Sequence, residues 1–416
     1  MSRTTTRPPW RIVFALMFFC SWCGNQFSPL LLMYKDVQHY SELTVNMFLG
    51  VYVLGLAPAL LIAGPLSDRH GRRPLMLAGV LTAVLASASL ALGTFGPVPI
   101  YLGRLLSGIT VGIAMAVGTS WMKELSSPRY EPGVDAAAGA RRSSLAFTLG
   151  SATGALVAGG IAQFTSFGEE LPFAVHILLT LPFAWLVLRA PETATNGGER
   201  GPLRAQLRIP GAGHKRFTRV VIVAAPWIFA SAALAYGYLP VLLAKQTGDW
   251  GLGYATLLTV VALGVASLVQ PLAKRLHSVS SARGLVAALV VIAVGLVVLT
   301  GAVAWGSLWL GGAASVVLGA GMGVALVSGL LEVQRIAGPR DLAGLTGMFY
   351  AVAYAGFLVP TIMAALTPPL STIGLFVALV VLAALSAVLL LASYTKHLPH
   401  PPTASAPTAP TPAIGS

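Results

Sequence analysis

Charged residues are scarce in this sequence, and their scarcity excludes a soluble globular fold. Asp, Glu, Lys and Arg make up 9% of the 416 residues, whereas 56% are hydrophobic. Soluble domains carry about 25% charged residues. The 26 basic residues outnumber the 13 acidic ones, but they lie between apolar runs instead of forming a basic face, so we expect no nucleic-acid partner. The composition indicates a protein surrounded by lipid.

Motifs for catalysis, metal binding and ATP hydrolysis are also missing. The two cysteines, Cys20 and Cys23, have the spacing of a redox motif but lie in an apolar run without a βαβ pattern, so we interpret them as packing residues. The glycines of residues 319–323 follow no strand and indicate close helix packing instead of a phosphate loop. We therefore expect no enzymatic activity, no cofactor and no metal.

Long apolar runs dominate what the sequence does contain. A helix needs about 20 apolar residues to cross a bilayer, and no alternating polarity typical of a β-barrel is present. The runs predict an all-α integral membrane protein with twelve transmembrane helices, at residues 11–33, 44–66, 74–93, 99–121, 143–165, 171–189, 219–243, 253–273, 284–305, 308–331, 342–366 and 371–394. The first run lacks the features of a cleaved signal peptide, so we expect it to be retained.

The distribution of basic residues predicts the orientation. When the N-terminus is placed inside, most Lys and Arg residues fall in inside segments, and the outside loops hold only Lys35 and Lys245. Basic residues in short loops stay on the cytoplasmic side. We expect a multi-pass protein of the plasma (inner) membrane with both termini in the cytoplasm.

The two halves of the chain resemble each other. Matching features occur about half a chain apart: residues 64–69 with 270–275, Gly108 and Gly112 with Gly319 and Gly323, and Phe147 and Gly154 with Phe349 and Gly356. Parallel repeats with a site between them are typical of secondary transporters. We predict two pseudo-symmetric six-helix bundles, 1–189 and 219–395, a cytoplasmic linker, 190–218, and a disordered cytoplasmic tail, 396–416.

One loop carries a specific family resemblance. The segment Gly64-Pro65-Leu66-Ser67-Asp68-Arg69-His70-Gly71-Arg72-Arg73 resembles the G-x-L-x-D-R-x-G-R-R signature of the major facilitator superfamily. The resemblance extends to Arg104 with Gly108, to Pro191-Glu192-Thr193, and to Gly356 with Pro360. It implies that Gly64, Asp68, Arg69, Gly71, Arg72 and Arg73 form a conformational switch that latches the halves together when the cavity opens outward. The alternative is a plain positive-inside stop.

Arg104 is the cation that the sequence places within a membrane helix. An unpaired cation at that depth costs at least ~2.5 kcal/mol, so it usually marks a functional pathway. The resemblance associates an arginine at this position with proton coupling or with substrate. The alternative is that its side chain snorkels to the outer interface.

Several polar and aromatic side chains at mid-depth are candidates for substrate contact. The resemblance places helices one, four, seven and ten around the cavity. The candidates are Trp22, Asn25, Gln26, Arg104, Tyr236, Tyr350 and Tyr354. Each of these residues can instead pack helices together. His176 is a candidate for proton coupling, and its alternative is a hydrogen-bonded structural histidine.

The acidic residues bear on the substrate. No Asp or Glu occupies the middle of a predicted helix, so binding of a cationic drug by a buried carboxylate is not expected, and a neutral, amphipathic or anionic solute fits better. Gly150, Gly154, Gly159 and Gly160 resemble an antiporter signature, although Gly154 is followed by Ala155 instead of proline. We favour an exporter of small organic solutes, either proton-coupled or facilitative, acting as a monomer. The alternatives are an importer of sugars or organic anions and a non-transporting sensor or scaffold.

Overall fold

The computed structural model describes residues 8–135, 138–194, 209–276, 278, 281–337, 342–367 and 369–396. Residues 195–208 of the predicted linker, 190–218, and all of the predicted tail after residue 396 lie outside these ranges. Within these ranges, the regular secondary-structure elements are all helices. One isolated β-bridge joins Ser278 and Ser281.

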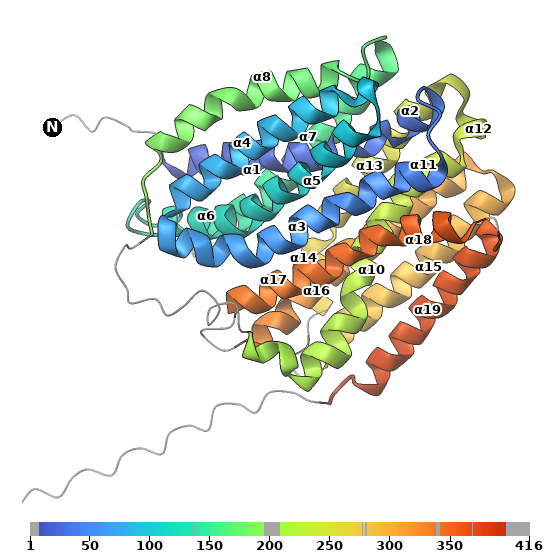
Figure 1. The fold of residues 1–416 in the computed structure, drawn as a ribbon. Helices are drawn as coiled ribbons and strands as arrows, with labels where there is room; N and C mark the ends of the chain where they lie inside the picture. The colour runs from blue at the N-terminus through green and yellow to red at the C-terminus, as the bar shows by residue number, and fades with distance from the viewer. Residues whose placement is uncertain are drawn as a thin grey trace, which may run out of the picture.

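The first half of the chain folds into helices that cross the molecule in alternating directions (Figure 1). Proline and glycine mark several of the breaks between them: Pro29 follows the first break, and Gly71, with a φ of +104°, separates α3 from α4. The elements are α1 (Trp10–Asn25), η1 (Ser28–Leu30), α2 (Leu31–Asp36), α3 (Glu42–His70), α4 (Arg72–Ala91), η2 (Gly93–Phe95), α5 (Pro97–Ile113), η3 (Ala114–Gly118), α6 (Thr119–Leu125), α7 (Ala138–Phe164), α8 (Leu171–Leu186) and η4 (Val187–Arg189).

The second half repeats this pattern of long helices and short breaks. Its elements are η5 (Pro210–Gly213), η6 (Phe217–Val221), α10 (Ile222–Ala232), η7 (Ala233–Tyr238), α11 (Leu239–Leu242), α12 (Ala244–Thr247), η8 (Gly248–Trp250), α13 (Gly251–Leu268), α14 (Gln270–Leu276), α15 (Arg283–Trp305), α16 (Leu308–Ile336), α17 (Leu342–Tyr354), η9 (Ala355–Leu358), α18 (Val359–Leu366) and α19 (Thr372–Ala392). Three segments, η3, η6 and η7, are π-helical.

Eleven helical stretches in the described part of the chain are long and apolar enough to cross a membrane. They match the eleven predicted runs from 44–66 onward. The first predicted run, 11–33, is instead divided, because α1 ends at Asn25 and a short turn and η1 precede α2. A single continuous helix over 11–33 is therefore not observed, and the twelfth span remains a prediction.

Glycine lets helices pack closely in equivalent places of the two halves. A Cβ atom at Gly108 would lie 2.0 Å from the carbonyl oxygen of Tyr52, so only glycine lets α5 approach α3 this closely. Likewise, a Cβ atom at the matching Gly319 would lie 2.5 Å from the carbonyl oxygen of Ala262, where α16 packs on α13. The prediction that the glycines of 319–323 serve close helix packing is confirmed.

A second pair of contacts repeats in the same way. Gly154 on α7 packs against the backbone of Trp22 on α1, and Gly356 in η9 packs against the carbonyl oxygen of Pro226 on α10. The matched glycines that the sequence shows half a chain apart thus make matched helix contacts.

The two cysteines lie inside the first half. Both are free and fully buried, and the Cys23 thiol lies 3.7 Å from the carbonyl oxygen of Ala83 on α4 and 3.6 Å from Oγ of Ser107 on α5. Their interpretation as packing residues is confirmed.

Candidate functional site

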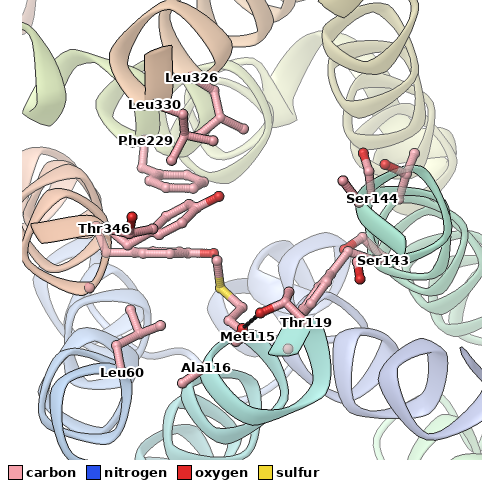
Figure 2. Close-up of a pocket in the computed structure, with 18 of the residues that line it drawn as sticks. Leu60, Met115, Ala116, Thr119, Ser143, Ser144, Phe229, Leu326, Leu330 and Thr346 are labelled. Atoms are coloured by element: carbon pink, nitrogen blue, oxygen red, sulfur yellow. Dashed lines mark hydrogen bonds between the residues drawn. The ribbon is translucent and has the colours of Figure 1, made fainter. Parts of the chain in front are cut away.

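A cavity of about 2490 Å³ lies between helices of the first and second halves. Its inner part is lined by Gly24, Arg104 and Tyr236, and it reaches Asp68, near the end of α3, and Gln270, at the start of α14. Figure 2 shows side chains from both halves around the open space, among them Leu60, Met115, Thr119, Ser144, Phe229, Leu326 and Thr346. We call the end that holds Arg72 the Arg72 end and the opposite one, which holds Lys35, the Lys35 end.

Direct contacts between the halves close the Lys35 end. Gln163 at the end of α7 donates a hydrogen bond to the carbonyl oxygen of Asp249 (2.8 Å) and accepts one from the N–H of Gly253 (2.7 Å). On the other side of the molecule, the Thr361 hydroxyl donates to the carbonyl oxygen of Asn46 (2.8 Å). Because the residues that line the cavity extend to the Arg72 end, the structure has its cavity open at that end and closed at the Lys35 end.

Arg104 lies at the inner end of the cavity and is 1% exposed. Its guanidinium donates through Nε to the carbonyl oxygen of Phe48 (3.0 Å) and through Nη1 to that of Gly24 (3.2 Å). The guanidinium carbon also lies 4.7 Å from the ring centres of both Phe27 and Tyr52. Neutral carbonyls and π-faces stabilise this cation, and among the described residues no carboxylate pairs with it.

Parallel aromatic rings form one wall of the cavity. Phe229 on α10 stacks on Tyr354 at the end of α17, with ring centres 3.8 Å apart and an interplanar angle of 14°. Phe357 lies nearly parallel to both rings, and Tyr52 packs its edge against Tyr354. We call Phe229, Tyr354 and Phe357 the aromatic shelf. The sequence indicated Tyr354, whereas the two phenylalanines were missed because they carry no polar group.

The structure divides the predicted substrate-contact residues into two groups. Asn25, Arg104, Tyr236, Tyr350 and Tyr354 are among the residues that line the cavity. Trp22 and Gln26 are not among them.

The other two lie deeper within the first half. Trp22 packs against Gly154 of α7, and Gln26 donates to the Ser87 hydroxyl (2.9 Å). Ser87 also lies 2.8 Å from Nδ1 of His176, whose Nε2 is 3.0 Å from the carbonyl oxygen of Phe19. With partners at both ring nitrogens, the fully buried His176 joins α8 to α4 and α1, the arrangement expected of its structural alternative.

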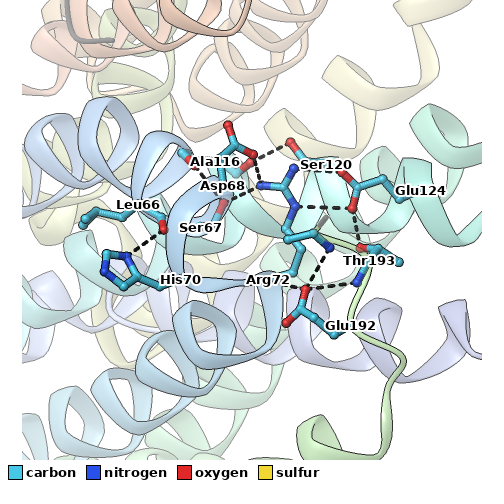
Figure 3. Close-up of polar contacts among 12 residues, drawn as sticks. Leu66, Ser67, Asp68, His70, Arg72, Ala116, Ser120, Glu124, Glu192 and Thr193 are labelled. Atoms are coloured by element: carbon cyan, nitrogen blue, oxygen red, sulfur yellow. Dashed lines mark hydrogen bonds and ion pairs between the residues drawn. The ribbon is translucent and has the colours of Figure 1, made fainter. Parts of the chain in front are cut away.

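Arg72 is the centre of the signature segment (Figure 3). Its guanidinium forms ion pairs with Asp68 (2.7 Å) and with Glu124 of α6 (2.8 Å), and it donates to the Ser67 hydroxyl (2.5 Å). These contacts join α3, α4 and α6 within the first half. Arg69 lies half-buried near the end of α3, and Gly64, five residues earlier, lines the cavity.

Glu192 caps the N-terminus of α4. Its carboxylate accepts hydrogen bonds from the N–H groups of Arg72 and Arg73 (2.9 Å each), which have no partner within their own helix. The Arg73 guanidinium donates a hydrogen bond to the carbonyl oxygen of Ala190 (2.7 Å). Gly71 is required here, because a Cβ atom would lie 2.6 Å from the Glu192 carboxylate and its φ is positive. Sequence similarity pointed to Pro191-Glu192-Thr193, but the role of Glu192 needed the fold.

The capping carboxylate of Glu192 makes the stability of the fold depend on pH. Burial tends to raise the pKa of Glu192, but the N–H groups of Arg73, Ala194, Arg72 and Thr193 outweigh it and hold the pKa below its usual value. A group with a lowered pKa contributes stability above its unfolded pKa of about 4.3, and this is lost as the pH falls through the folded pKa. We expect the unfolding temperature of purified protein to fall below about pH 4, and Glu192→Gln to unfold earlier at pH 7 with a weaker dependence on acid. Parallel pH curves for the two proteins would contradict this role.

Known proteins similar to this chain are membrane transporters, which agrees with a cavity between two halves. The sequence matches the Major Facilitator Superfamily over residues 12–359. The chain belongs to this superfamily. Solved transporter structures share its fold: a point mutant of the nucleoside transporter NupG has a TM-score of 0.71 at 11% identity, covering 92% of this chain and 98% of that one. A POT family transporter in complex with a thioalcohol-conjugated peptide has a TM-score of 0.74 at 13% identity, covering 92% and 95%.

Curated relatives match over a shorter stretch. Multidrug resistance protein MdtL of Citrobacter koseri is 30% identical over 89 residues, which are 21% of this chain and 23% of the relative. MdtL of Escherichia coli K12 (DH10B) is 29% identical over 89 residues, 21% of this chain and 22% of the relative. The matches thus span less than a quarter of these relatives. As a superfamily member with many apolar helices, the chain is a multi-pass membrane protein.

Proposed function

We propose that the protein is a secondary transporter that carries a small organic solute across the plasma membrane by alternating access. The observation that supports this most is the cavity between the two halves, open at the Arg72 end and closed at the Lys35 end. Such a cavity exposes a bound solute to one side of the membrane at a time. Transport requires that the closing contacts break as the opposite end closes.

The halves are proposed to be two six-helix bundles, 1–189 and 219–395, that rock against each other. The matched glycine contacts support this repeat, because Gly108 and Gly319 join equivalent helices, as do Gly154 and Gly356. The interrupted segment from α1 to α2 is then the first of twelve spans. The segment 190–218 connects the bundles, and the protein acts as a monomer.

The cavity is proposed to open to the cytoplasm. Basic residues in loops remain on the cytoplasmic side, and only Lys35 and Lys245 lie at the Lys35 end of the described chain. The basic residues described at the Arg72 end include Arg11, Arg69, Arg72, Arg73, Lys123, Arg129, Arg141, Arg142, Arg189, Lys215, Arg216, Arg219, Arg275, Arg283, Arg335 and Lys396. Both termini are then cytoplasmic.

Export is the proposed direction, with protons as the candidate coupling ion through Arg104 or His176. The relatives named multidrug resistance proteins support efflux, as do the close glycine contacts of α7 at Gly150 and Gly154. Import of organic anions is the second candidate, since Arg104 at the inner end of the cavity suits an anion in either direction.

Flux measurements in proteoliposomes test this proposal. A panel of labelled organic anions, cations and sugars is followed with and without a pH gradient, and at least one solute is expected to cross faster than in empty liposomes. We expect Asp68→Asn to reduce this flux about tenfold or more, because Asp68 holds Arg72 in the signature segment, with Asp249→Asn at the Lys35 end as the charge-matched control. Proton-driven accumulation toward the Lys35 side would support efflux. Binding without flux of any solute would instead support a sensor.

A further inference from the structure

The charges that line the cavity are unbalanced. Among the described residues, the charged side chains on its wall are those of Arg72, Arg104, Lys123, Arg141 and a single carboxylate, Asp68. Asp68 is paired with Arg72. Arg141 is paired outside the cavity wall with Asp135. The wall therefore carries an excess of positive charge from its mouth to its inner end.

Two of these cations have no ionic partner in the described part of the chain. Lys123 lies at the Arg72 end, and Arg104 lies at the inner end. Arg104 uses Nε and Nη1 for backbone carbonyls, which leaves Nη2 without a protein partner among the residues described. A buried guanidinium offers a carboxylate far stronger attachment than water-exposed arginine does, because little water screens the pair.

The aromatic shelf lies close to this cation. Tyr52 contacts both: the Arg104 guanidinium is 4.7 Å from its ring centre, and the ring of Tyr354 is 6.1 Å from it. Phe229 is the partly exposed ring of the shelf, whereas Tyr354 and Phe357 are 8% and 6% exposed, so a ligand in the cavity that the shelf lines meets mainly the ring of Phe229. Flat aromatic molecules stack on such a ring better than flexible aliphatic chains do.

We infer that the cavity binds planar aromatic carboxylates, with the carboxylate at Arg104 and the ring on the shelf of Phe229, Tyr354 and Phe357. This inference rests on the proposed function for its physiological meaning, but binding can be measured without transport. Lys123 attracts the anion at the mouth, and Arg104 holds it at the inner end. An aromatic cation of the same shape meets two unpaired positive charges and is excluded.

Equilibrium binding to the purified full-length chain in detergent tests the inference with three matched probes. These are 1-naphthoate, 1-naphthylmethylammonium and cyclohexanecarboxylate, followed by isothermal titration calorimetry. We expect 1-naphthoate to bind about tenfold or more tightly than either of the others, since each lacks one of the two recognised features. Equal or tighter binding of 1-naphthylmethylammonium would overturn the inference, and so would no binding of 1-naphthoate.

Two variants locate the contacts. Arg104→Gln is expected to weaken 1-naphthoate binding about tenfold or more, and Phe229→Leu to weaken it about three- to tenfold while leaving cyclohexanecarboxylate unchanged. The Phe229→Leu comparison also answers the question if Arg104→Gln does not fold. Binding of 1-naphthoate without flux of any solute supports the substrate class and contradicts the transporter. Flux of cations by a protein that does not bind 1-naphthoate supports the transporter and contradicts the class.

Discussion

Gly159→Val is expected to abolish most transport by preventing closure of the Lys35 end. A Cβ atom at Gly159 on α7 would lie 1.8 Å from Oγ1 and 2.9 Å from Cβ of Thr256 on α13, so the two helices must separate. Overpacked contacts cost about 1–3 kcal/mol, and each 1.4 kcal/mol changes an equilibrium constant tenfold. We expect the population of the state with its cavity open at the Arg72 end to fall about tenfold or more.

The adjacent glycine supplies the control. A Cβ atom at Gly160 meets nothing within 4 Å, so Gly160→Val should transport like the wild type. A cysteine introduced at Ser28, which lines the cavity, reports the state through labelling by an impermeant maleimide from the Lys35 side. Labelling should rise in Gly159→Val and not in Gly160→Val. Thr256→Ala should restore part of the flux, because it removes the atom met at 1.8 Å. Equal behaviour of the two valine variants would refute this gate.

Glu332→Ala is expected to destabilise the second half strongly. The carboxylate of Glu332 on α16 pairs with Arg216 at 2.6 Å, and the two side chains are 4% and 0% exposed. It also pairs with Arg335 at 2.9 Å. Removal of one partner of a buried pair leaves the other charge unpaired, at a cost of about 3–5 kcal/mol. Thermal unfolding in detergent should show a large drop in the unfolding temperature.

A less buried pair provides the comparison. Glu131 pairs with Arg142 at 2.7 Å, but the two side chains are 31% and 18% exposed. Glu131→Ala should therefore cost about 1 kcal/mol or less. The double variant Arg216→Met with Glu332→Leu should recover much of the loss, since apolar side chains of similar size replace the charges. The buried pair has no special weight if Glu332→Ala and Glu131→Ala unfold at the same temperature.

Hydropathy predicted eleven of the spans because lipid leaves a backbone no other way to satisfy its hydrogen bonds. The same rule says nothing of local breaks. The interruption between α1 and α2 and the π-helical turns η3 and η7 depend on how neighbouring helices pack, which hydropathy does not encode. The close packing of helices could be predicted from the sequence, because repeated glycines in an apolar helix, as in α5 and α16, let neighbouring backbones approach closely.

The sequence predicted how deep in the membrane the site residues lie, but not which side of each helix faces the cavity. Asn25, Arg104 and Tyr236 line the cavity as expected, whereas Gln26, one residue from Asn25, points to Ser87 inside the first half. A run that is apolar on every side gives no periodic signal to separate these faces. The partners of Arg72 were hidden for another reason: Glu124 and Glu192 lie 52 and 120 residues away in sequence.

The enclosure of both natural thiols has a practical consequence. Cys20 and Cys23 are fully buried, and Cys23 is held between α4 and α5. The wild-type chain therefore supplies an unreactive background for single-cysteine reporters, with no need to delete either residue. Any maleimide labelling of the wild-type protein would then report how often α1 separates from its neighbours. The two thiols therefore serve as built-in reporters of helix packing in the first half.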